Sequence, residues 1–533
     1  MSHFAPLDSE RDLVSAALAL GARDVRGWSE AEYELQRSAG TAPAKRTVRA
    51  LQKAIAAGDD PLGDAFCALR SPEERRPDGA TYTPDEIVQS MVEWSANQLS
   101  PERVVDPGSG SARFAVAAGR RFRDSKLVAV ELDPLAALLA RAHLAAAGFA
   151  DRSRVILADY RDYDFKDFPG RTLFIGNPPY VRHHDLATSW KEWLVREAGG
   201  LGYSASQLAG LHVYFMLQTA LRASKDDVGV FITSAEWLDV NYGSLVRGLF
   251  LNQLGGESLH VIEPTAQPFE DAQTTAVISC FKVGSQPTSV RMRRVKKIDQ
   301  LNALGGGQPV LRERLEEARR WTALTRPPKK MPEGFVQLGE IASVHRGQVT
   351  GRNATWVVGN EEEALPESVK YPSITRAHEL FTAQTFLSKS DHLKRVVDIP
   401  QDLGALDPTD RKMVDNFLKQ AQRDGAHESY VAKNRKVWWS VGLRDPAPIL
   451  ATYMARRPPA FVRNSTRARH INIAHGIYPR EKMRDTELTL LAESLRQVAT
   501  LGDGRMYAGG LTKFEPKEME RLPVPSLELL ASR

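Results

Sequence analysis

Cysteine is almost absent from this sequence. Only Cys67 and Cys280 occur among 533 residues, too few for a disulfide framework or a cysteine-rich metal site and in keeping with a reducing cytoplasm. No uninterrupted apolar run approaches the roughly 18 to 20 residues of a membrane helix, and residues 1–11 do not resemble a signal peptide. We therefore expect a soluble, cytoplasmic protein with no membrane partner.

A large excess of one charge is missing as well. With 71 Lys and Arg against 66 Asp and Glu, the formal net charge is only +5, which permits a polyanionic partner without demanding one. Hydrophobic residues make up 42% of the chain and charged residues 26%, which excludes a largely disordered protein. The length predicts two to four domains.

The pattern of apolar residues divides the chain into four parts. Residues 1–75 have helical spacing and predict a short helical N-terminal region. Residues 76–284 alternate short apolar runs with amphipathic stretches, which predicts an α/β, doubly wound, Rossmann-like domain. Residues 285–334 are rich in glycine, proline and charge and predict a linker. The length of the remaining segment, residues 335–533, fits one domain, and we expect a separate C-terminal domain of mixed α/β structure.

The first chemical signal is a small-residue turn between an expected strand and an expected helix. Asp106 is followed by Gly108 and Gly110, which let the backbone approach a ligand closely, although a plain strand-to-helix turn has the same pattern. The next strand ends at Glu131, about 20 residues later, where a carboxylate can accept from ribose hydroxyls. The loop lacks the full G-x-G-x-x-G and any phosphate-binding G-K-[ST]. S-adenosylmethionine therefore fits better than NAD or ATP.

The ends of the next two expected strands add ligand-binding groups. Asp159 is placed to accept from the adenine amine of the cofactor while Tyr160 packs against the ring; a solvated strand end is the other interpretation. The following strand leads into the sequence N-P-P-Y. Its consecutive prolines cannot donate, so the carbonyls of Asn177 and Pro178 are acceptors for a ligand. These acceptors, followed by Tyr180, predict a site for a planar group with an exocyclic amine.

The order of these elements resembles the gamma-type N6-adenine DNA methyltransferases of bacterial restriction-modification systems. Gly79–Pro84 resembles the family element G-x-x-Y-T-P, which implies that Thr81, Tyr82 and Thr83 help to hold the methionine part of the cofactor. Gln267–Phe269 resembles the element whose aromatic side chain, here Phe269, packs against the flipped base.

The resemblance continues towards the C-terminus. Residues 338–351 and 507–516 resemble the opening and closing segments of the family's target-recognition domain, so residues 335–533 are expected to read the DNA sequence. One position departs from the family. Ala112 stands where many relatives carry glycine, which predicts a slightly tighter fit around the cofactor.

The resemblance implies an S-adenosylmethionine-dependent enzyme that methylates the N6 amine of adenine in double-stranded DNA. Asn177 and Pro178 would hold this amine in line with the sulfonium methyl, without a covalent enzyme intermediate. Because the amine is inaccessible in a duplex, the base must be flipped out, with Pro179 and Tyr180 against it and Phe269 flanking it. We expect the modification component of a restriction-modification system, a monomer in solution, with a separate cognate restriction endonuclease left open.

Basic residues gather in the segment 431–480, where ten Lys and Arg stand against Asp445 alone. Interleaved aromatic and amide side chains favour DNA contact over a merely solvated basic face. Arg463 and Asn464 are the expected readers of base edges. Further expected DNA contacts are Arg182, Arg346, Arg456, Arg457, Arg467 and Arg469.

Other interpretations stay open at this point. An N4-cytosine or RNA methyltransferase would use the same acceptors, because they fit any planar amine. A protein-glutamine methyltransferase would not need the basic C-terminal domain, and the intact cofactor elements argue against a non-catalytic DNA-specificity subunit. Cytosine-C5 methylation is excluded, since neither cysteine lies in a Pro-Cys loop. His183 and His184 lack a third ligand at metal spacing, so no metal is expected.

Overall fold

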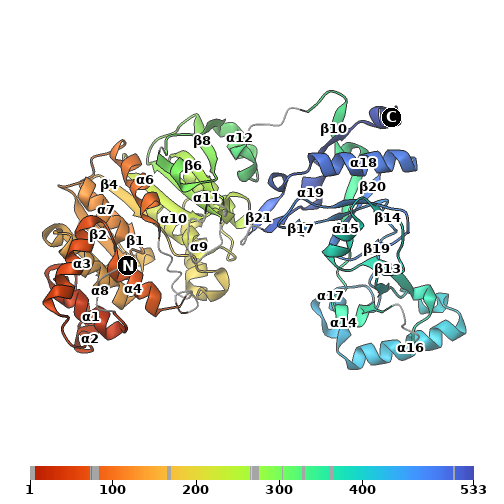
Figure 1. The fold of residues 1–533 in the computed structure, drawn as a ribbon, viewed down its shortest axis with the longest axis horizontal. Coiled ribbons are helices and arrows are strands. Elements are labelled where there is room, and N and C mark those ends of the chain that lie inside the picture. The colour runs from red at the N-terminus through yellow and green to blue at the C-terminus, as the bar shows by residue number, and fades with distance from the viewer. Residues whose placement is uncertain are drawn as a thin grey trace. The chain divides into compact units, whose positions relative to one another are not determined.

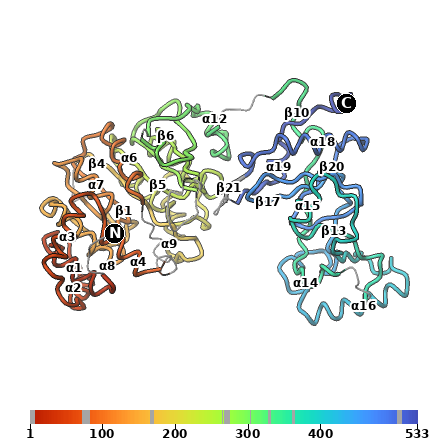
Figure 2. Tube along the Cα trace, in the orientation of Figure 1, coloured from red at the N-terminus to blue at the C-terminus, as the bar shows by residue number. Residues whose placement is uncertain are grey.

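A computed structural model describes residues 7–71, 74, 83–164, 170–263, 266, 275–302, 304–326, 331–359, 364–507 and 511–532. The chain divides into two compact units (Figure 1), the first within Met1–Pro328 and the second formed by Lys329–Tyr507 and Leu511–Arg533. In the trace of Figure 2 the first unit runs from red to green and the second from green to blue. No helix among the described residues combines the length and apolar character needed to cross a membrane.

A nine-stranded sheet forms the centre of the first unit. Its strand order is β3-β2-β1-β4-β5-β7-β6-β8-β9. The order reverses direction between β1 and β4, which run parallel to each other, and such a switch point opens a ligand-binding crevice at the carboxyl ends of the strands. The predicted doubly wound α/β fold is thereby confirmed. The strands are β1 (Arg103–Pro107), β2 (Lys126–Glu131), β3 (Ser153–Leu157), β4 (Thr172–Gly176), β5 (Val228–Ser234), β6 (Gly256–Ile262), β7 (Ala276–Lys282), β8 (Ser289–Val295) and β9 (Gln308–Leu311).

Helices cover both faces of this sheet. Alternate residues of a strand point to opposite faces, so Val104 belongs to one hydrophobic core and Val105 to the other. The first core includes residues of α6 and α7, and the second includes residues of α9, α10 and α11. The helices are α6 (Asp85–Ala96), α7 (Arg113–Arg121), α8 (Pro134–Ala146), α9 (Thr188–Gly200), α10 (Leu211–Arg222), α11 (Ser244–Leu251) and α12 (Arg312–Glu317).

The N-terminal region consists of α1 (Glu10–Ala19), α2 (Glu30–Arg37), α3 (Lys45–Ala57) and α4 (Pro61–Leu69). These helices share a hydrophobic core with α8, beside which they lie in Figure 1. A fully buried ion pair joins α2 to α8, with 2.5 Å between Glu32 Oε1 and Arg141 Nε. The segment between α1 and α2 also reaches the edge of the sheet, where Val155 N of β3 donates to the carbonyl of Arg26 at 3.1 Å.

The prediction that residues 285–334 form a linker is wrong for most of this range. Residues 289–295 form β8, which pairs in parallel with β6, and β9 then pairs antiparallel with β8. The arginines of β8 concealed this strand in the sequence. Arg291 is exposed and Arg293 and Arg294 are half-buried, whereas Val290, Met292 and Val295 are buried. The strand tolerates these charges because Arg291 reaches solvent, while Arg293 Nε donates to His260 Nδ1 at 2.8 Å and Arg294 Nε donates to Thr325 Oγ1 at 2.9 Å.

The second unit combines several smaller sheets with helices. Its largest sheet has the order β11-β20-β16-β18-β14, and α18 packs against β18 beside a core that contains Leu491 and Phe461. The strands are β10 (Phe335–Gln337), β11 (Ala342–Arg346), β12 (Val357–Val358), β13 (Lys370–Ile374), β14 (Phe386–Leu387), β15 (Arg395–Val397), β16 (Ile449–Thr452), β17 (Met454–Ala455), β18 (Phe461–Asn464), β19 (Arg469–His470), β20 (Ala474–Pro479), β21 (Arg505–Tyr507), β22 (Leu511–Lys513) and β23 (Pro523–Pro525). The helices are α13 (Leu338–Ile341), α14 (Asn353–Trp356), α15 (Ala377–Ala383), α16 (Pro408–Arg423), α17 (Tyr430–Lys433), α18 (Asp485–Val498), α19 (Pro516–Met519) and α20 (Leu527–Ala531).

Candidate active site

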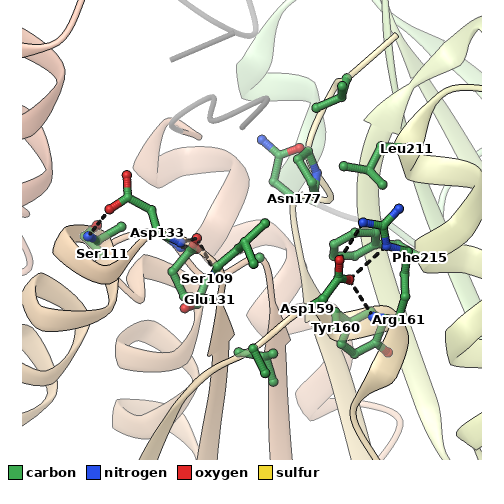
Figure 3. A pocket seen from close by; sticks show the side chains of 18 of the residues that line it. Ser109, Ser111, Glu131, Asp133, Asp159, Tyr160, Arg161, Asn177, Leu211 and Phe215 are labelled. Carbon is green, nitrogen blue, oxygen red and sulfur yellow. Dashed lines mark hydrogen bonds and ion pairs between the residues drawn. The ribbon is translucent and has the colours of Figure 1, made fainter. Parts of the chain in front are cut away.

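A cavity of about 320 Å³ lies in the first unit, at the end of the sheet where the loops after β1, β2, β3 and β4 meet (Figure 3). This volume is within the range of pockets that take small molecules. The sequence-predicted residues that line it are Thr83, Gly108, Gly110, Glu131, Asp159, Tyr160, Asn177 and Pro179. Elements that are up to about 100 positions apart in the chain therefore converge on one site.

The glycine-rich loop after β1 adopts conformations that suit glycine. Gly108 has φ +67°, and a Cβ there would lie 3.2 Å from Cδ of Pro179. Gly110 has φ +53° and Ala112 has φ +64°, so the loop enters α7 through a left-handed residue that is not glycine. The glycines therefore permit the close approach of this loop to the N-P-P-Y turn.

Glu131 stands at the end of β2 and faces the loop. Its Oε2 accepts from Gly110 N at 2.7 Å, and its Oε1 accepts from Leu132 N at 2.7 Å and Asp133 N at 3.0 Å. Burial raises the pKa of Glu131, although these backbone hydrogen bonds oppose the shift. The carboxylate is thus fixed against the glycine loop on the wall of the cavity.

Asp159 has a partner that the sequence did not predict. Both carboxylate oxygens accept from the Arg161 guanidinium, at 2.8 Å from Nε and 2.5 Å from Nη2, as Figure 3 shows. The guanidinium carbon lies 3.6 Å from the ring centroid of Trp190 in α9. Arg161 and Trp190 also line the cavity. An arginine two positions after the aspartate was the local signal for this pair.

Tyr160 is buried between the sheet and α10. Its ring stacks on Phe215 with 5.0 Å between centroids, and its hydroxyl lies 2.9 Å from Thr219 Oγ1. Both rings line the cavity. They therefore supply an apolar wall, of which Phe215 and its helical neighbour Leu211 were missed by the sequence analysis (Figure 3).

The N-P-P-Y turn follows β4 directly. Asn177 Nδ2 donates to Thr83 Oγ1 at 3.0 Å, which joins the turn to the described end of the upstream G-x-x-Y-T-P element. This bond orients the amide, because the nitrogen points to Thr83 and the oxygen must point away from it. Pro178 is buried, and Tyr180 packs against the hydrophobic core rather than on the cavity wall. Arg182 is exposed just beyond the turn.

Asp106 lies beneath the glycine loop rather than on the cavity wall. Its Oδ2 accepts from Ala115 N of α7 at 3.0 Å, and its Oδ1 has no hydrogen-bond partner in the described part of the chain. Burial raises the pKa of Asp106 well above its usual range, and the nearby charge of Glu131 adds to the effect. Thr81, Tyr82 and Phe269 lie outside the described residues.

The structure argues against base reading by Arg463 and Asn464. Both residues are buried in β18, with 7% of Arg463 and 5% of Asn464 exposed. Arg463 donates to the carbonyl of Pro448 at 2.9 Å and pairs with Asp485 at 2.7 Å. Asn464 Nδ2 donates to two backbone carbonyls. Their polar groups therefore stabilise the fold of the second unit. A basic segment in the sequence is compatible with this role and with DNA contact alike.

Other basic residues of the second unit remain at its surface. Arg346 is exposed at the end of β11, and its guanidinium carbon lies 5.5 Å from the ring centroid of Tyr453. Lys513 Nζ lies 5.9 Å from the same ring. Arg469 is half-buried over Tyr371. The exposed members of the basic segment are Lys433, Lys436, Arg444, Arg456, Arg457, Arg467 and Arg480.

The two histidines after the turn have their rings in contact at a tilt of 41°, with 3.8 Å between the ring centroids of His183 and His184. No group of three or more His, Cys, Asp or Glu residues in the described ranges is arranged to hold a metal ion.

Two protein-family models match the chain. The model of the Eco57I restriction-modification methylase matches residues 162–263. The model of the C-terminal domain of type II methyltransferase M.Eco57I matches residues 329–533. The first match includes the N-P-P-Y turn, and the second coincides with the second structural unit.

Curated relatives extend the similarity over the whole chain. The type II methyltransferase M.XamI of Xanthomonas campestris pv. amaranthicola is 48% identical over 533 residues, which are 98% of this chain and 99% of the relative. A tRNA1(Val) (adenine(37)-N6)-methyltransferase of Shewanella amazonensis is 32% identical over 182 residues, 32% of this chain and 78% of the relative.

A solved structure shares the fold. The type IIL restriction-modification enzyme MmeI, determined in complex with DNA, aligns with a TM-score of 0.54 at 13% sequence identity and covers 100% of this chain and 80% of its own.

Proposed function

The chain belongs to the type II DNA methyltransferases of restriction-modification systems, and from this premise we propose that it methylates the N6 amine of an adenine flipped out of duplex DNA. The observation that carries the proposal is the N-P-P-Y turn, which presents Asn177 at the cavity beside the glycine loop. The relative that methylates adenine in tRNA supports the choice of adenine, since its name states N6 chemistry.

The cavity fits S-adenosylmethionine, the methyl donor of this family. Glu131 offers a carboxylate to the ribose, and Gly108 leaves space that a Cβ would fill. Tyr160 and Phe215 form an apolar wall for the adenine moiety, and Asp159 lies beside them with Arg161. When bound, the donor supplies an electrophilic methyl group on a sulfonium, so no protein nucleophile is needed.

Asn177 and Pro178 act on the target amine. The lone pair of an exocyclic amine is delocalised into the ring, which makes this nitrogen a weak nucleophile. An amide oxygen and a backbone carbonyl that accept its two hydrogens favour a pyramidal nitrogen and hold it in position for attack. The hydrogen bond from Asn177 to Thr83 preorganises this arrangement. Pro179 and Tyr180 follow directly and are proposed to contact the extruded base.

We assign DNA recognition to the second unit. Arg346 beside Tyr453 combines a guanidinium with an aromatic ring at the surface, a pairing that can contact both phosphates and bases. We propose that exposed Arg456, Arg457 and Arg467 contact phosphates of the DNA. Arg182 is the proposed DNA contact from the first unit. We further propose that the enzyme is a monomer and that the cognate restriction endonuclease is a separate protein.

Nucleoside analysis tests the proposed reaction. The protein is incubated with isotopically labelled S-adenosylmethionine and duplex DNA, and the digested nucleosides are identified by mass spectrometry. N6-methyldeoxyadenosine is expected. Labelled N4-methyldeoxycytidine alone would overturn the adenine assignment, and labelling of RNA or protein alone would overturn the DNA assignment.

A pair of asparagine variants tests the site. Asn177→Ala should lower methyl transfer by about 100-fold or more while the protein still binds the cofactor, the scale seen when one preorganised polar group is removed. Asn97→Ala, at an exposed position after α6, should leave turnover unchanged. Equal activity of the two variants would remove Asn177 from the mechanism.

A further inference from the structure

The N-terminal helices contribute directly to the wall of the cofactor cavity. Phe66 of α4 and Arg70 just after it line the cavity. Arg70 pairs with Asp133, the capping residue of α8, and its Nε donates to Glu10 at 2.7 Å. These contacts join α1 and α4 to the loop after β2, although residues 1–75 contain no recognisable chemical motif.

Asp60 makes a second set of contacts between α4 and the cavity loops. It caps the N-terminus of α4 by accepting from Gly63 N at 2.9 Å, and the residue is only 4% exposed. Ser111 of the glycine loop donates its hydroxyl to Asp60 Oδ2, and Arg113 Nε donates to the same oxygen at 3.2 Å. His143 Nδ1 of α8 is 3.6 Å from Asp60 Oδ1.

This carboxylate is held in its charged form. Burial alone would raise the pKa of Asp60, but the nearby imidazole of His143, the charge of Arg113 and the hydrogen bonds from Ser111 and Gly63 outweigh burial and lower the pKa. Burial lowers the pKa of His143 as well, so Arg113 is the partner that keeps a positive charge at neutral pH. A buried charge of this kind restrains its partners strongly, because a displaced donor would leave it unsatisfied.

The partners of Asp60 flank the strained point of the glycine loop. Ser111 and Arg113 are the neighbours of Ala112, whose φ of +64° is unfavourable for a residue with a Cβ. Arg113 continues the network, since its Nη1 donates to the carbonyl of Thr83 at 2.8 Å. Thr83 in turn accepts from Asn177. A continuous chain of polar contacts therefore runs from α4 through the glycine loop to the amine-binding turn.

We propose that Asp60 is a positioning residue of the methyl-transfer site and that the N-terminal helices are an integral part of that site. Asp60 fixes the ligand-binding conformation of the glycine loop through Ser111 and Arg113. The inference rests on the cofactor cavity assigned above but not on the identity of the methylated base.

The test compares two buried carboxylates of the N-terminal region in the full-length protein. Asp60→Asn keeps the shape of the side chain but removes its charge at the glycine loop. Glu32→Gln is the matched control, because Glu32 forms the fully buried ion pair with Arg141 of α8, away from the cavity lining. Calorimetry with S-adenosylmethionine and with its demethylated product gives the dissociation constants, and thermal unfolding gives Tm.

Both variants should lower Tm, but only Asp60→Asn should weaken cofactor binding, by about tenfold. Its KM for DNA should stay within about twofold of the parent value. Unchanged cofactor affinity in Asp60→Asn, or an equal loss in Glu32→Gln, would overturn the proposal and leave Asp60 with a purely structural role.

A second variant keeps the test decisive if Asp60→Asn does not fold. Ser111→Ala removes one donor to Asp60 at the loop and should weaken cofactor binding about threefold or more. Under conditions where Asp60→Asn folds, the two losses should not add in the double variant, because both substitutions remove the same contact. Parent-like affinity in Ser111→Ala, or full additivity, would refute the proposed path. The calorimetric measurements need no nucleic acid, so they stay informative if the target proves not to be adenine.

Discussion

Replacing Arg463 should impair the stability of the second unit and leave sequence preference intact. In Arg463→Met the hydrogen bonds to the carbonyls of Pro448 and Asn464 are lost. Each contributes about 1 kcal/mol. The ion pair with Asp485 adds at most about 1 kcal/mol, because Asp485 is 91% exposed and solvent screens it. Methionine still fills much of the apolar space of the arginine stem. The expected loss of unfolding free energy is therefore about 2–3 kcal/mol.

Urea denaturation of the full-length protein measures this loss, and DNA affinity at several salt concentrations measures binding. Arg463→Met should retain the parent's preference for cognate over scrambled duplex under conditions where it is folded. Arg467→Ala is the comparison, because Arg467 is exposed. It should keep parental stability and reduce the slope of log affinity against log salt by roughly 0.9. Relaxed specificity in Arg463→Met with unchanged stability would refute this reasoning and restore Arg463 as a base reader.

Three further outcomes follow from the first unit. Arg161→Met should lower the unfolding free energy by about 2–3 kcal/mol, since it leaves the carboxylate of Asp159 without its partner. The same variant should bind the cofactor more weakly in calorimetry. Tighter binding would show instead that Arg161 competes with the cofactor. Asp106→Asn should stabilise the protein more at pH 7 than at pH 4 in urea titrations. The pKa of Asp106 in the folded protein is raised above 3.8, so the parent loses stability as the pH rises from 3.8 towards that folded-state pKa, whereas the asparagine variant does not. A stability difference between parent and variant that does not change with pH would contradict the raised pKa. Ala112→Gly should raise the unfolding free energy by up to about 1 kcal/mol by relieving the left-handed alanine, and a fall would show that chain entropy outweighs strain.

The parts of the site that sequence could predict are those formed by short segments. The glycine loop, the acidic end of β2 and the N-P-P-Y turn each follow a strand directly, so the strand pattern and the parallel topology together place Gly108, Glu131 and Asn177 at one edge of the sheet. The structure brings these three residues to one cavity.

Contacts between distant segments were beyond such reasoning. Asp60 meets the glycine loop, and Phe66 reaches the cavity, only because α4 packs on α8, and nothing in their local sequence indicates this. Arg463 shows the opposite case. Its charge suggested an exposed role, but Arg463 is buried in β18, against which α18 packs, and two backbone carbonyls and the Asp485 carboxylate accept from its guanidinium. Burial of a polar residue depends on tertiary partners that composition does not reveal.

The contact between Arg26 and Val155 has a consequence for solubility. Strand β3 ends the nine-stranded sheet, and an unpaired outer strand offers its N–H and C=O groups to other molecules. The segment around Arg26 occupies part of that outer edge, and Gly27 approaches so closely that a Cβ would lie 2.2 Å from the carbonyl oxygen of Val155. A fragment trimmed to residue 76 would keep every motif of the methyltransferase domain but uncover this edge and the apolar side of α8. Such a fragment should self-associate through strand pairing, whereas the full-length protein, whose N-terminal segment covers part of this edge, should not.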